Sequence, residues 1–520
     1  MHKPEDVIAD KKRPFTGAEY LKSLRDDREI WIYGERVKDV TTHPAFRNSA
    51  VSISKLYDAM HDEKTKNVLT APTDTGSGGY THKFFKYARN SDDLLGQRDA
   101  MAQWARQSYG MMGRTPDYKA SFLNTLGANA DFYGEYKSNA EAWYKRAQES
   151  VAFVNHTLVN PPIDREKPPS EIKDIYVSVD KETDAGIYVS GAKVVATSSA
   201  LTHYNFLGQN MAAEITDPSM VVMFMADMST PGIKLICRNS YELASAAVGS
   251  PFDYPLSSRF DENDAIFVFD NAFIPWENVF IYRDIEMLKK FYPQSGFVNG
   301  FNFQSATRLT TKLEFIVGIL SKALRATGAE NFRGVQVMLG EVISWRNLMW
   351  SLTETMARVP QEWSNGAVLP NMTAATTFRV FSSEALPAIK AIIEKIVASG
   401  LIYLPSSAMD FKNPDIDKYL KQYVRGSNGT DYVERIKIMK LLWDAMGTEF
   451  GGRHELYERN YAGNHENIRL IPLFNARGSG ALSEMEALAE ECMADYDENG
   501  WKAPDYHSGE DVSILGKLQS

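Results

Sequence analysis

The pattern of apolar and polar positions divides the chain into three regions. Apolar residues recur at helical spacing over much of residues 1–150, most clearly in "LLGQRDAMAQWARQSYGMM", which starts at Leu94. Residues 151–282 alternate instead and carry turn residues, as in the hairpin pattern of residues 174–197. Long periodic segments return in residues 283–520 and end in a polar tail. The pattern therefore predicts an α+β multidomain protein with an N-terminal helical domain, a middle antiparallel β domain and a C-terminal helix bundle.

Shorter patterns predict individual elements. Thr16 and Glu19 have the spacing of a helix capping box. The stretch "EIWIYGERV" indicates a strand pair that turns near Gly34. The stretches "MVVMFMADMSTPGIKLICR" and "DAIFVFDNAFIPWENVFIY" repeat this alternation around turn residues, so we expect two further hairpins there.

Composition and charge narrow the possible functions. The 520 residues are 44% hydrophobic and 24% charged, as in ordinary globular proteins. A net charge of -10 argues against a nucleic-acid partner, which needs a basic face. The apolar runs fall short of the ~20 residues of a membrane span, and the N-terminus lacks the apolar core of a signal peptide. With only Cys237 and Cys492, we expect a cytoplasmic protein without a disulfide framework.

The motifs of several common enzyme classes are missing. The glycines of residues 76–79 have the wrong spacing for a dinucleotide-binding loop and follow no predicted strand. The stretch "RHELYE" at Arg453 holds only one histidine of a zinc-protease pair, and the nine histidines lack zinc-ligand spacing, so no metal site is predicted. These absences disfavour Rossmann dehydrogenases, P-loop enzymes, zinc hydrolases and α/β-hydrolases. A cofactor that binds without one of these motifs is still compatible with the sequence.

The stretch "GRTPDYKA" is a candidate anion site. Thr115 and Pro116 suit the N-cap and the first position of a helix, which puts Arg114 just before that helix and Tyr118 in its first turn. Backbone N–H groups, a guanidinium and a phenol can then converge on one anionic oxygen. On spacing alone, however, the pattern favours an ordinary helix start.

The stretch "VNHTLVNPPIDR" places His156 before a rigid turn. An imidazole can accept a proton from a substrate near neutral pH, and a Pro-Pro turn can lie against a flat ring. The stretch alone favours a histidine in the core.

Two other stretches are candidate cofactor contacts. The hydroxyls of residues 197–199 fit either a flavin or phosphate contact or a polar turn. Residues 462–464 fit a helix cap better than a pyrophosphate contact.

Several stretches, spread from about Arg13 to Trp501, resemble one enzyme family. They include "RPFTGAEYLKSL", "TDTGSGGYTHKFF", "GRTPDYKA", "NPPIDR", "ETDAGIYVSGAKVVAT", "SGLIYLPSSA" and "EFGGRHELYE". By these stretches the sequence resembles the oxygenase component of two-component 4-hydroxyphenylacetate 3-monooxygenases. The resemblance implies an acyl-CoA dehydrogenase-like fold with a β-barrel-like middle domain, and a homotetramer. It also implies reduced FAD (FADH2) as a diffusible co-substrate from a separate NADH-dependent flavin reductase, which explains the missing nicotinamide motif.

The resemblance also assigns roles to residues. Arg114, Tyr118 and His156 would hold the phenol oxygen of the substrate and carry catalysis, with His156 as general base. The flavin contacts would be His156, Thr157, Pro162, Ile163, Asp164, Arg165, Thr197, Ser198, Ala462, Gly463, Asn464 and His465, while Arg333 and Gln336 would reach a neighbouring subunit's flavin. Gln209 and Asn210 are candidate substrate contacts in a variable loop at residues 206–214.

The implied reaction is the ortho-hydroxylation of 4-hydroxyphenylacetate to 3,4-dihydroxyphenylacetate with O2, through a flavin hydroperoxide. Related phenol hydroxylases of 4-coumarate, tyrosine or chlorophenols are an alternative, because the loop at residues 206–214 is expected to set selectivity. A flavin-storage protein is another. A 4-hydroxybutyryl-CoA dehydratase on the same scaffold would need several cysteine ligands for its iron–sulfur cluster, and the chain has only two cysteines.

Overall fold

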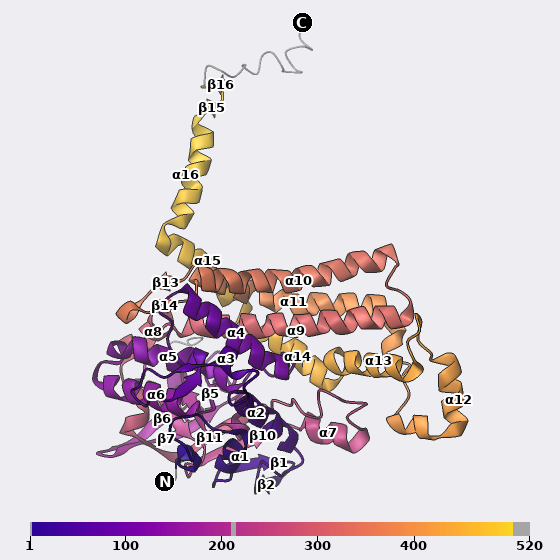
Figure 1. Cartoon of the computed structure of the whole chain (residues 1–520). Coiled ribbons are helices and arrows are strands. Elements are labelled where there is room, and N and C mark those ends of the chain that lie inside the picture. Colours follow the sequence, from indigo (N-terminus) through magenta and orange to yellow (C-terminus); the bar gives the residue numbers. More distant parts are fainter. Residues whose placement is uncertain (1–2, 210–214, 503–520) are drawn as a thin grey trace. The chain divides into compact units, whose positions relative to one another are not determined.

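The computed structural model describes residues 3–209 and 215–502 (Figure 1). The described residues up to Tyr461 form one compact unit, and those from Ala462 onward form a second. Helices come first along the chain, strands dominate the middle, and long helices follow, which confirms the predicted α+β class. Among the described helices, none combines the length and apolar character needed to cross a bilayer.

One of the N-terminal helices is buried on all sides. These helices are α1 (Gly17–Ser23), α2 (Arg47–Ala59), α3 (Lys66–Leu69), α4 (Ser91–Gln107), α5 (Pro116–Ala128) and α6 (Lys137–Ser150), with a small hairpin of β3 (Thr70–Pro72) and β4 (Tyr80–His82). The capping box of α1 is confirmed, because the Glu19 N–H donates to Thr16 Oγ1 at 3.2 Å. Every residue of α5 except Gly127 is buried, including several polar ones. Because buried polar groups need partners, the polar side chains of α5 are candidates for a functional site.

Apart from three two-stranded hairpins, the described strands form two open sheets and no closed barrel. The larger sheet has the order β2 (Glu35–Val37), β1 (Glu29–Ile32), β10 (Ile233–Cys237), β11 (Ala265–Pro275), β7 (Gly186–Lys193) and β6 (Ser178–Thr183). The smaller has the order β12 (Val279–Tyr282), β9 (Val222–Asp227), β8 (Tyr204–Leu207) and β5 (Val154–Thr157). Most pairs are antiparallel, but β1 with β10 and β5 with β8 are parallel. Since β1 and β2 join strands of the middle region, the boundaries at residues 150 and 282 stay predictions.

Two of the predicted hairpins are confirmed and two are wrong. The pairs β1–β2 and β6–β7 form as expected. The strands β9 and β10 lie in different sheets, so the "STPG" turn carries the chain from one sheet to the other. The predicted turn at "DNAFIP" lies inside the 11-residue strand β11, where a bulge between Phe269 and Ala272 holds Asn271 at φ 51°. Turn-forming residues that tolerate positive φ serve a bulge equally well.

Long helices form the C-terminal bundle of the first unit, and α9, α10 and α11 run alongside one another (Figure 1). The helices of this region are α8 (Ile285–Gln294), α9 (Phe297–Thr327), α10 (Arg333–Arg358), α11 (Met372–Val397), α12 (Pro414–Tyr423), α13 (Tyr432–Met446) and α14 (Glu449–Asn460), with a hairpin of β13 (Gln361–Glu362) and β14 (Val368–Leu369). The short helix α7 (Tyr241–Val248) lies between β10 and β11 instead. The second unit holds α15 (His465–Ser479), α16 (Ala481–Ala494), β15 (Tyr496–Asp497) and β16 (Gly500–Trp501). A Cβ at Gly300 would lie 2.7 Å from the Ser121 carbonyl oxygen, so α5 and α9 are in close contact.

Candidate functional site

Arg114, Tyr118 and His156 lie together at the start of α5. Pro116 opens this helix and Thr115 occupies its N-cap position, as predicted, although the Thr115 hydroxyl donates to Asp117 Oδ1 (2.5 Å) instead of accepting from the backbone. The Arg114 guanidinium carbon lies 3.9 Å from the centre of the Tyr118 ring. The Tyr118 and His156 rings meet edge to face at 5.4 Å. Tyr118 and His156 thus present a phenol and an imidazole beside one guanidinium.

Arg114 is held by Tyr457 of α14 and by Glu262, which lies just before β11. Its Nη1 donates to the Tyr457 hydroxyl at 2.8 Å, and its backbone N–H donates to Glu262 Oε1 at 2.5 Å. A Cβ at Gly113 would lie 2.5 Å from the Tyr457 hydroxyl, so glycine is needed for this approach. The remaining side-chain nitrogens of Arg114 have no hydrogen-bond partner among the described residues, and they can therefore bind an anionic oxygen.

The protonation states suit recognition of a phenol. Burial raises the pKa of Tyr118, with Arg114 opposing this, so its hydroxyl stays protonated and can donate. Burial, then Lys119 and Arg114, lower the pKa of His156 well below its ordinary value, so the imidazole is neutral at neutral pH. Lys119 Nζ lies 2.8 Å from His156 Nδ1, while Nε2 has no hydrogen-bond partner among the described residues. Lys119 lies inside "GRTPDYKA" but was not among the predicted site residues.

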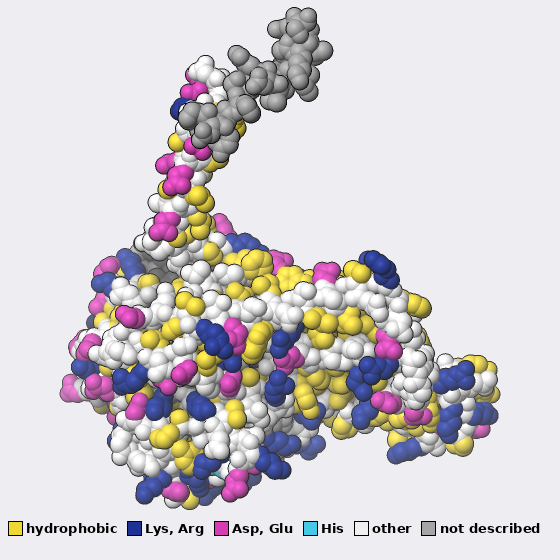
Figure 2. All heavy atoms as spheres, turned by 45° about the horizontal axis from the view of Figure 1, so that its top comes forward, with side chains coloured by type: hydrophobic (Ala, Val, Ile, Leu, Met, Phe, Trp, Pro, Cys, Tyr) yellow, Lys and Arg dark blue, Asp and Glu magenta, His cyan; other side chains and the backbone are white. Residues whose placement is uncertain are grey.

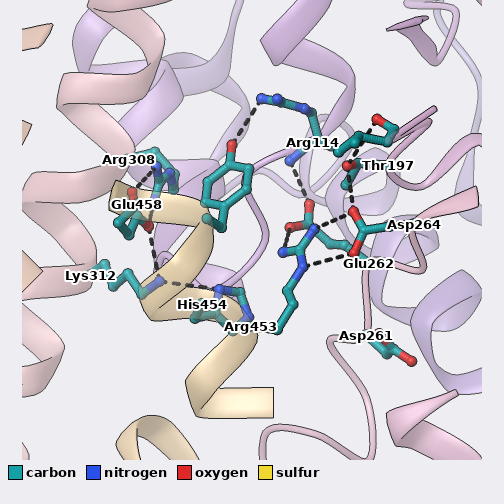
Figure 3. Close-up of polar contacts among 12 residues, drawn as sticks. Arg114, Thr197, Asp261, Glu262, Asp264, Arg308, Lys312, Arg453, His454 and Glu458 are labelled. Carbon is teal, nitrogen blue, oxygen red and sulfur yellow. Dashed lines mark hydrogen bonds and ion pairs between the residues drawn. The ribbon is translucent and has the colours of Figure 1, made fainter. Parts of the chain in front are cut away.

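A network of charged residues fixes Thr197 near this group (Figure 3). Arg453 donates to both oxygens of Asp264 at 2.8 and 3.0 Å, and its Nη1 lies 3.3 Å from Glu262 Oε2. The Thr197 hydroxyl donates to Asp264 Oδ1 at 2.6 Å, and its carbonyl accepts from Asn155 Nδ2 of β5 at 3.1 Å. Burial alone would raise the pKa of Asp264, but Arg453 and Arg238 hold it well below its usual range. Thr197 is therefore anchored to β5 and to α14.

A second buried cluster joins α9 to α14 (Figure 3). Glu458 accepts hydrogen bonds from Arg308 Nη2 and Lys312 Nζ, both at 2.9 Å, and Lys312 Nζ also lies 3.2 Å from His454 Nδ1. Burial alone would raise the pKa of Glu458, but Arg308 and Lys312 lower it to about 2. The sequence patterns did not reveal either cluster, because their members lie far apart along the chain.

Two predicted flavin contacts carry buried hydroxyls that lack partners. Thr157 Oγ1 in β5 and Ser198 Oγ have no hydrogen-bond partner among the described residues. Buried polar atoms without partners are rare, and a flavin ring carries carbonyl and nitrogen acceptors for such donors. These two hydroxyls thus fit the ring. Pro162, Ile163, Asp164 and Arg165 form an exposed turn beyond β5, where Asp164 accepts from Lys167 at 2.6 Å.

Of the two predicted loop residues, the structure describes only Gln209. Gln209 is buried, with its Oε1 accepting from Lys193 Nζ (2.9 Å) and its Nε2 donating to the Met220 carbonyl oxygen (2.9 Å). Its amide therefore anchors the base of the loop. Asn210 lies outside the described residues.

Arg333 and Gln336 are exposed at the start of α10. The helix α9 has 31 residues and is roughly 45 Å long, and it separates them from its contact with α5 at Gly300. They therefore lie far from the site at the start of α5 in the same chain. Ala462–His465 open the second unit, where Asn464 accepts from the N–H groups of Glu466 and Asn467. This segment therefore caps the start of α15 and does not end α14.

Comparisons with known proteins agree along the whole chain. The N-terminal and C-terminal profiles of the 4-hydroxyphenylacetate 3-hydroxylase family match residues 16–281 and 288–490. The chain is 60% identical to the 4-hydroxyphenylacetate 3-monooxygenase oxygenase component of Pseudomonas aeruginosa, over 99% of this chain and 100% of that protein. It is 53% identical to the oxygenase component of a 4-nitrophenol 2-monooxygenase from a Rhodococcus species, over 98% and 97%.

A solved structure agrees as well. The oxygenase component of 4-hydroxyphenylacetate 3-monooxygenase, complexed with FAD and 4-hydroxyphenylacetate, matches with a TM-score of 0.86 at 32% identity and covers 92% of this chain and 99% of that one. The two profiles span the segments that hold Arg114, His156 and Arg453. The chain belongs to the 4-hydroxyphenylacetate 3-hydroxylase family.

Proposed function

We propose that the chain is the oxygenase component of a two-component monooxygenase that converts 4-hydroxyphenylacetate to 3,4-dihydroxyphenylacetate with reduced FAD and O2. The observation that carries this proposal is the convergence of Arg114, Tyr118 and His156, three groups suited to one phenolic oxygen. The names of the relatives and the FAD and substrate in the matched structure support it.

The three side chains have separate tasks. The free N–H groups of Arg114 and the Tyr118 hydroxyl donate to the phenolic oxygen and stabilise the negative charge that develops on it. His156 Nε2 accepts the phenolic proton. Loss of this proton makes the ring carbon beside the oxygen electron-rich, which is the position that receives the new hydroxyl group.

The flavin would lie along β5 and the segment that follows β7. Reduced FAD, when bound, activates O2 for transfer of one oxygen atom. Thr157, Thr197 and Ser198 would hold the ring, and Asp264 keeps Thr197 in place. The Phe297 ring, 6.4 Å from that of His156, covers the imidazole and helps to exclude water.

The proposal also includes partners. A separate NADH-dependent flavin reductase would supply FADH2, and the chain would act in the cytoplasm, where Cys237 and Cys492 stay reduced. A homotetramer would cover exposed apolar side chains of the bundle such as Val337 (65% exposed) and Phe381 (42%), and Figure 2 shows such side chains along the bundle. Arg333 and Gln336, far from their own site, would then reach a neighbour's flavin.

The test is a coupled reaction with a flavin reductase, NADH, FAD and O2. Chromatography should detect 3,4-dihydroxyphenylacetate, and 4-coumarate, tyrosine, chlorophenols and 4-nitrophenol should react more slowly. If reduced FAD is bound and no phenol is hydroxylated, the chain is a flavin-storage protein and the proposal is wrong. A faster reaction with another phenol would correct the substrate alone.

A further inference from the structure

Lys119 is a buried amine beside the imidazole of His156. It is fully buried, and its Nζ lies 2.8 Å from His156 Nδ1. The elements packed around it contribute rings: Phe297 of α9 at 4.2 Å, Phe206 of β8 at 5.2 Å and Phe122 of α5 at 5.8 Å from Nζ to the ring centres. The α5 helix also places the Tyr118 ring 5.8 Å from Nζ, and Arg114 of the same segment is the other charged group that acts on it. Among the described residues, no carboxylate forms an ion pair with Lys119.

The chain contains a second buried lysine–histidine pair that makes the contrast clear. Lys312 lies 3.2 Å from His454, yet it also forms an ion pair with Glu458 at 2.9 Å. The ammonium of Lys312 is therefore compensated, and the pair is structural. Lys119 has no such counter-ion, and burial of an uncompensated ammonium is costly. Burial accordingly lowers the pKa of Lys119 well below its ordinary value.

Burial and the missing counter-ion thus favour the neutral forms of both Lys119 and His156 before a ligand arrives. One proton lies in the hydrogen bond between Nζ and Nδ1, and either atom can carry it. A negative charge beside Nε2 would change this balance, because it favours a positive charge on the pair. The rings around Nζ can stabilise an ammonium by cation–π contacts.

We propose that Lys119 is a positioning residue that acts through His156 and receives the proton that the substrate loses. The O–H bond of the phenol breaks as the Nε2–H bond forms, and the Nδ1–H bond breaks as a third N–H bond forms on Nζ. The electron pair stays on the phenolate oxygen, and Lys119 becomes an ammonium. The site thereby gains one negative and one positive charge, separated by the imidazole. This step rests on the proposed function, since it requires a phenol at Nε2.

The other role open to Lys119 is simply to donate to Nδ1 and fix one imidazole tautomer. Lys119→Arg separates the two roles, because a guanidinium can donate but cannot accept a proton. Lys119→Met removes both roles at similar side-chain length. Lys312→Met is the matched control in the structural pair.

The first test is spectroscopic and needs no turnover. The probe is 4-nitrophenol, whose phenolate absorbs visible light, titrated at a pH below the pKa of the free phenol. Wild type and Lys312→Met should bind it largely as phenolate, whereas Lys119→Met and Lys119→Arg should bind it as the neutral phenol. An equal phenolate fraction in wild type and Lys119→Met would overturn the proposal, and so would a phenolate fraction retained by Lys119→Arg. Circular dichroism of each variant checks folding.

The second test is the pH profile of kcat/KM for 4-hydroxyphenylacetate. Near pH 7 both Lys119 variants should be slower by about 10²-fold, the lower range for general base catalysis. The deficit should shrink as the pH rises toward ~10, where a phenol arrives already ionised. A deficit independent of pH would contradict the relay. If wild type makes no catechol at all, the proposed function fails, while the spectroscopic result still decides the role of Lys119.

Discussion

Arg114 donates a hydrogen bond of 2.8 Å to the hydroxyl of Tyr457, which lies 343 residues later in the chain. The same guanidinium lies over the Tyr118 ring, so Arg114 is held between an N-terminal and a C-terminal tyrosine. Its orientation toward a ligand thus depends on α14 as much as on its own segment.

Tyr457→Phe should lower kcat/KM for 4-hydroxyphenylacetate by about tenfold, because a hydrogen bond to a charged group contributes about 1.5 kcal/mol. The effect should fall mainly on substrate affinity, since Arg114 keeps its charge but loses its fixed orientation. The control is Tyr419→Phe, which removes the hydroxyl of a 54% exposed tyrosine and should change nothing. Equal kinetics for the two variants would mean that Tyr457 does not orient Arg114.

Asp264→Asn should weaken the binding of FAD. The substitution removes the charge that holds Arg453 and leaves one acceptor oxygen where Arg453 and Thr197 now share two, so the anchor of the segment that follows β7 is weakened. We expect the dissociation constant of FAD, followed by fluorescence, to rise about tenfold or more. Asp270→Asn is the matched control, because Asp270 lies in β11, which begins directly after Asp264, and forms an exposed ion pair with Lys234. Similar FAD affinities for both variants would contradict the role of Asp264.

Thr157→Val should stabilise the FAD-free protein and reduce the further stabilisation that FAD gives. Without FAD the variant should be more stable by about 1 kcal/mol, because it removes a buried hydroxyl without a partner. With FAD the added thermal stability should be smaller than in wild type. Thr125→Val is the control, since the Thr125 hydroxyl donates to the Phe122 carbonyl oxygen at 2.6 Å and its loss should destabilise both states. Melting curves of both variants with and without FAD test this prediction. A lower melting temperature of Thr157→Val without FAD would show that the Thr157 hydroxyl has a partner in the FAD-free protein.

Glu458→Gln should destabilise the protein in a pH-dependent way. The pKa of Glu458 falls from 4.5 to about 2 on folding, so its ionised form contributes about 3 kcal/mol of stability. This contribution is complete above pH 4.5 and is lost as the pH falls through about 2. Urea unfolding should therefore give a large difference between wild type and variant at pH 7 and a smaller one at pH 3. A difference that stays constant with pH would show that the ion pair is not its source.

Local patterns predicted elements well and contacts poorly. The helix start at Pro116 and the hairpin of β6 and β7 follow from capping and alternation, which act over a few residues. The pairing of Arg453 with Asp264 depends on how α14 packs against the sheet, and no local spacing encodes it. The sequence patterns assigned Arg453 no role of its own, because "RHELYE" lacks the second histidine of a zinc-protease motif.

Lys119 illustrates the same limit. A lysine in a helix is normally exposed, and its burial follows only from the position of α5 among β5, β8 and α9. The failed hairpin predictions have a related cause, because turn residues serve sheet crossovers and bulges as readily as hairpins. Only the resemblance to a family predicted that Arg114, Tyr118 and His156 form one site. Their spacing in the sequence did not predict it.

The distance along the chain between Arg114 and Tyr457 also has a consequence for protein synthesis. At the usual rate of translation, the ribosome needs roughly 20 to 70 seconds to make the 343 residues that separate them. During that time Arg114 lacks its partner on α14, and Lys119 stays uncovered until Phe297 of α9 has been made. A nascent chain is therefore exposed to misfolding at its future active centre, and truncation before α14 would leave that centre incomplete.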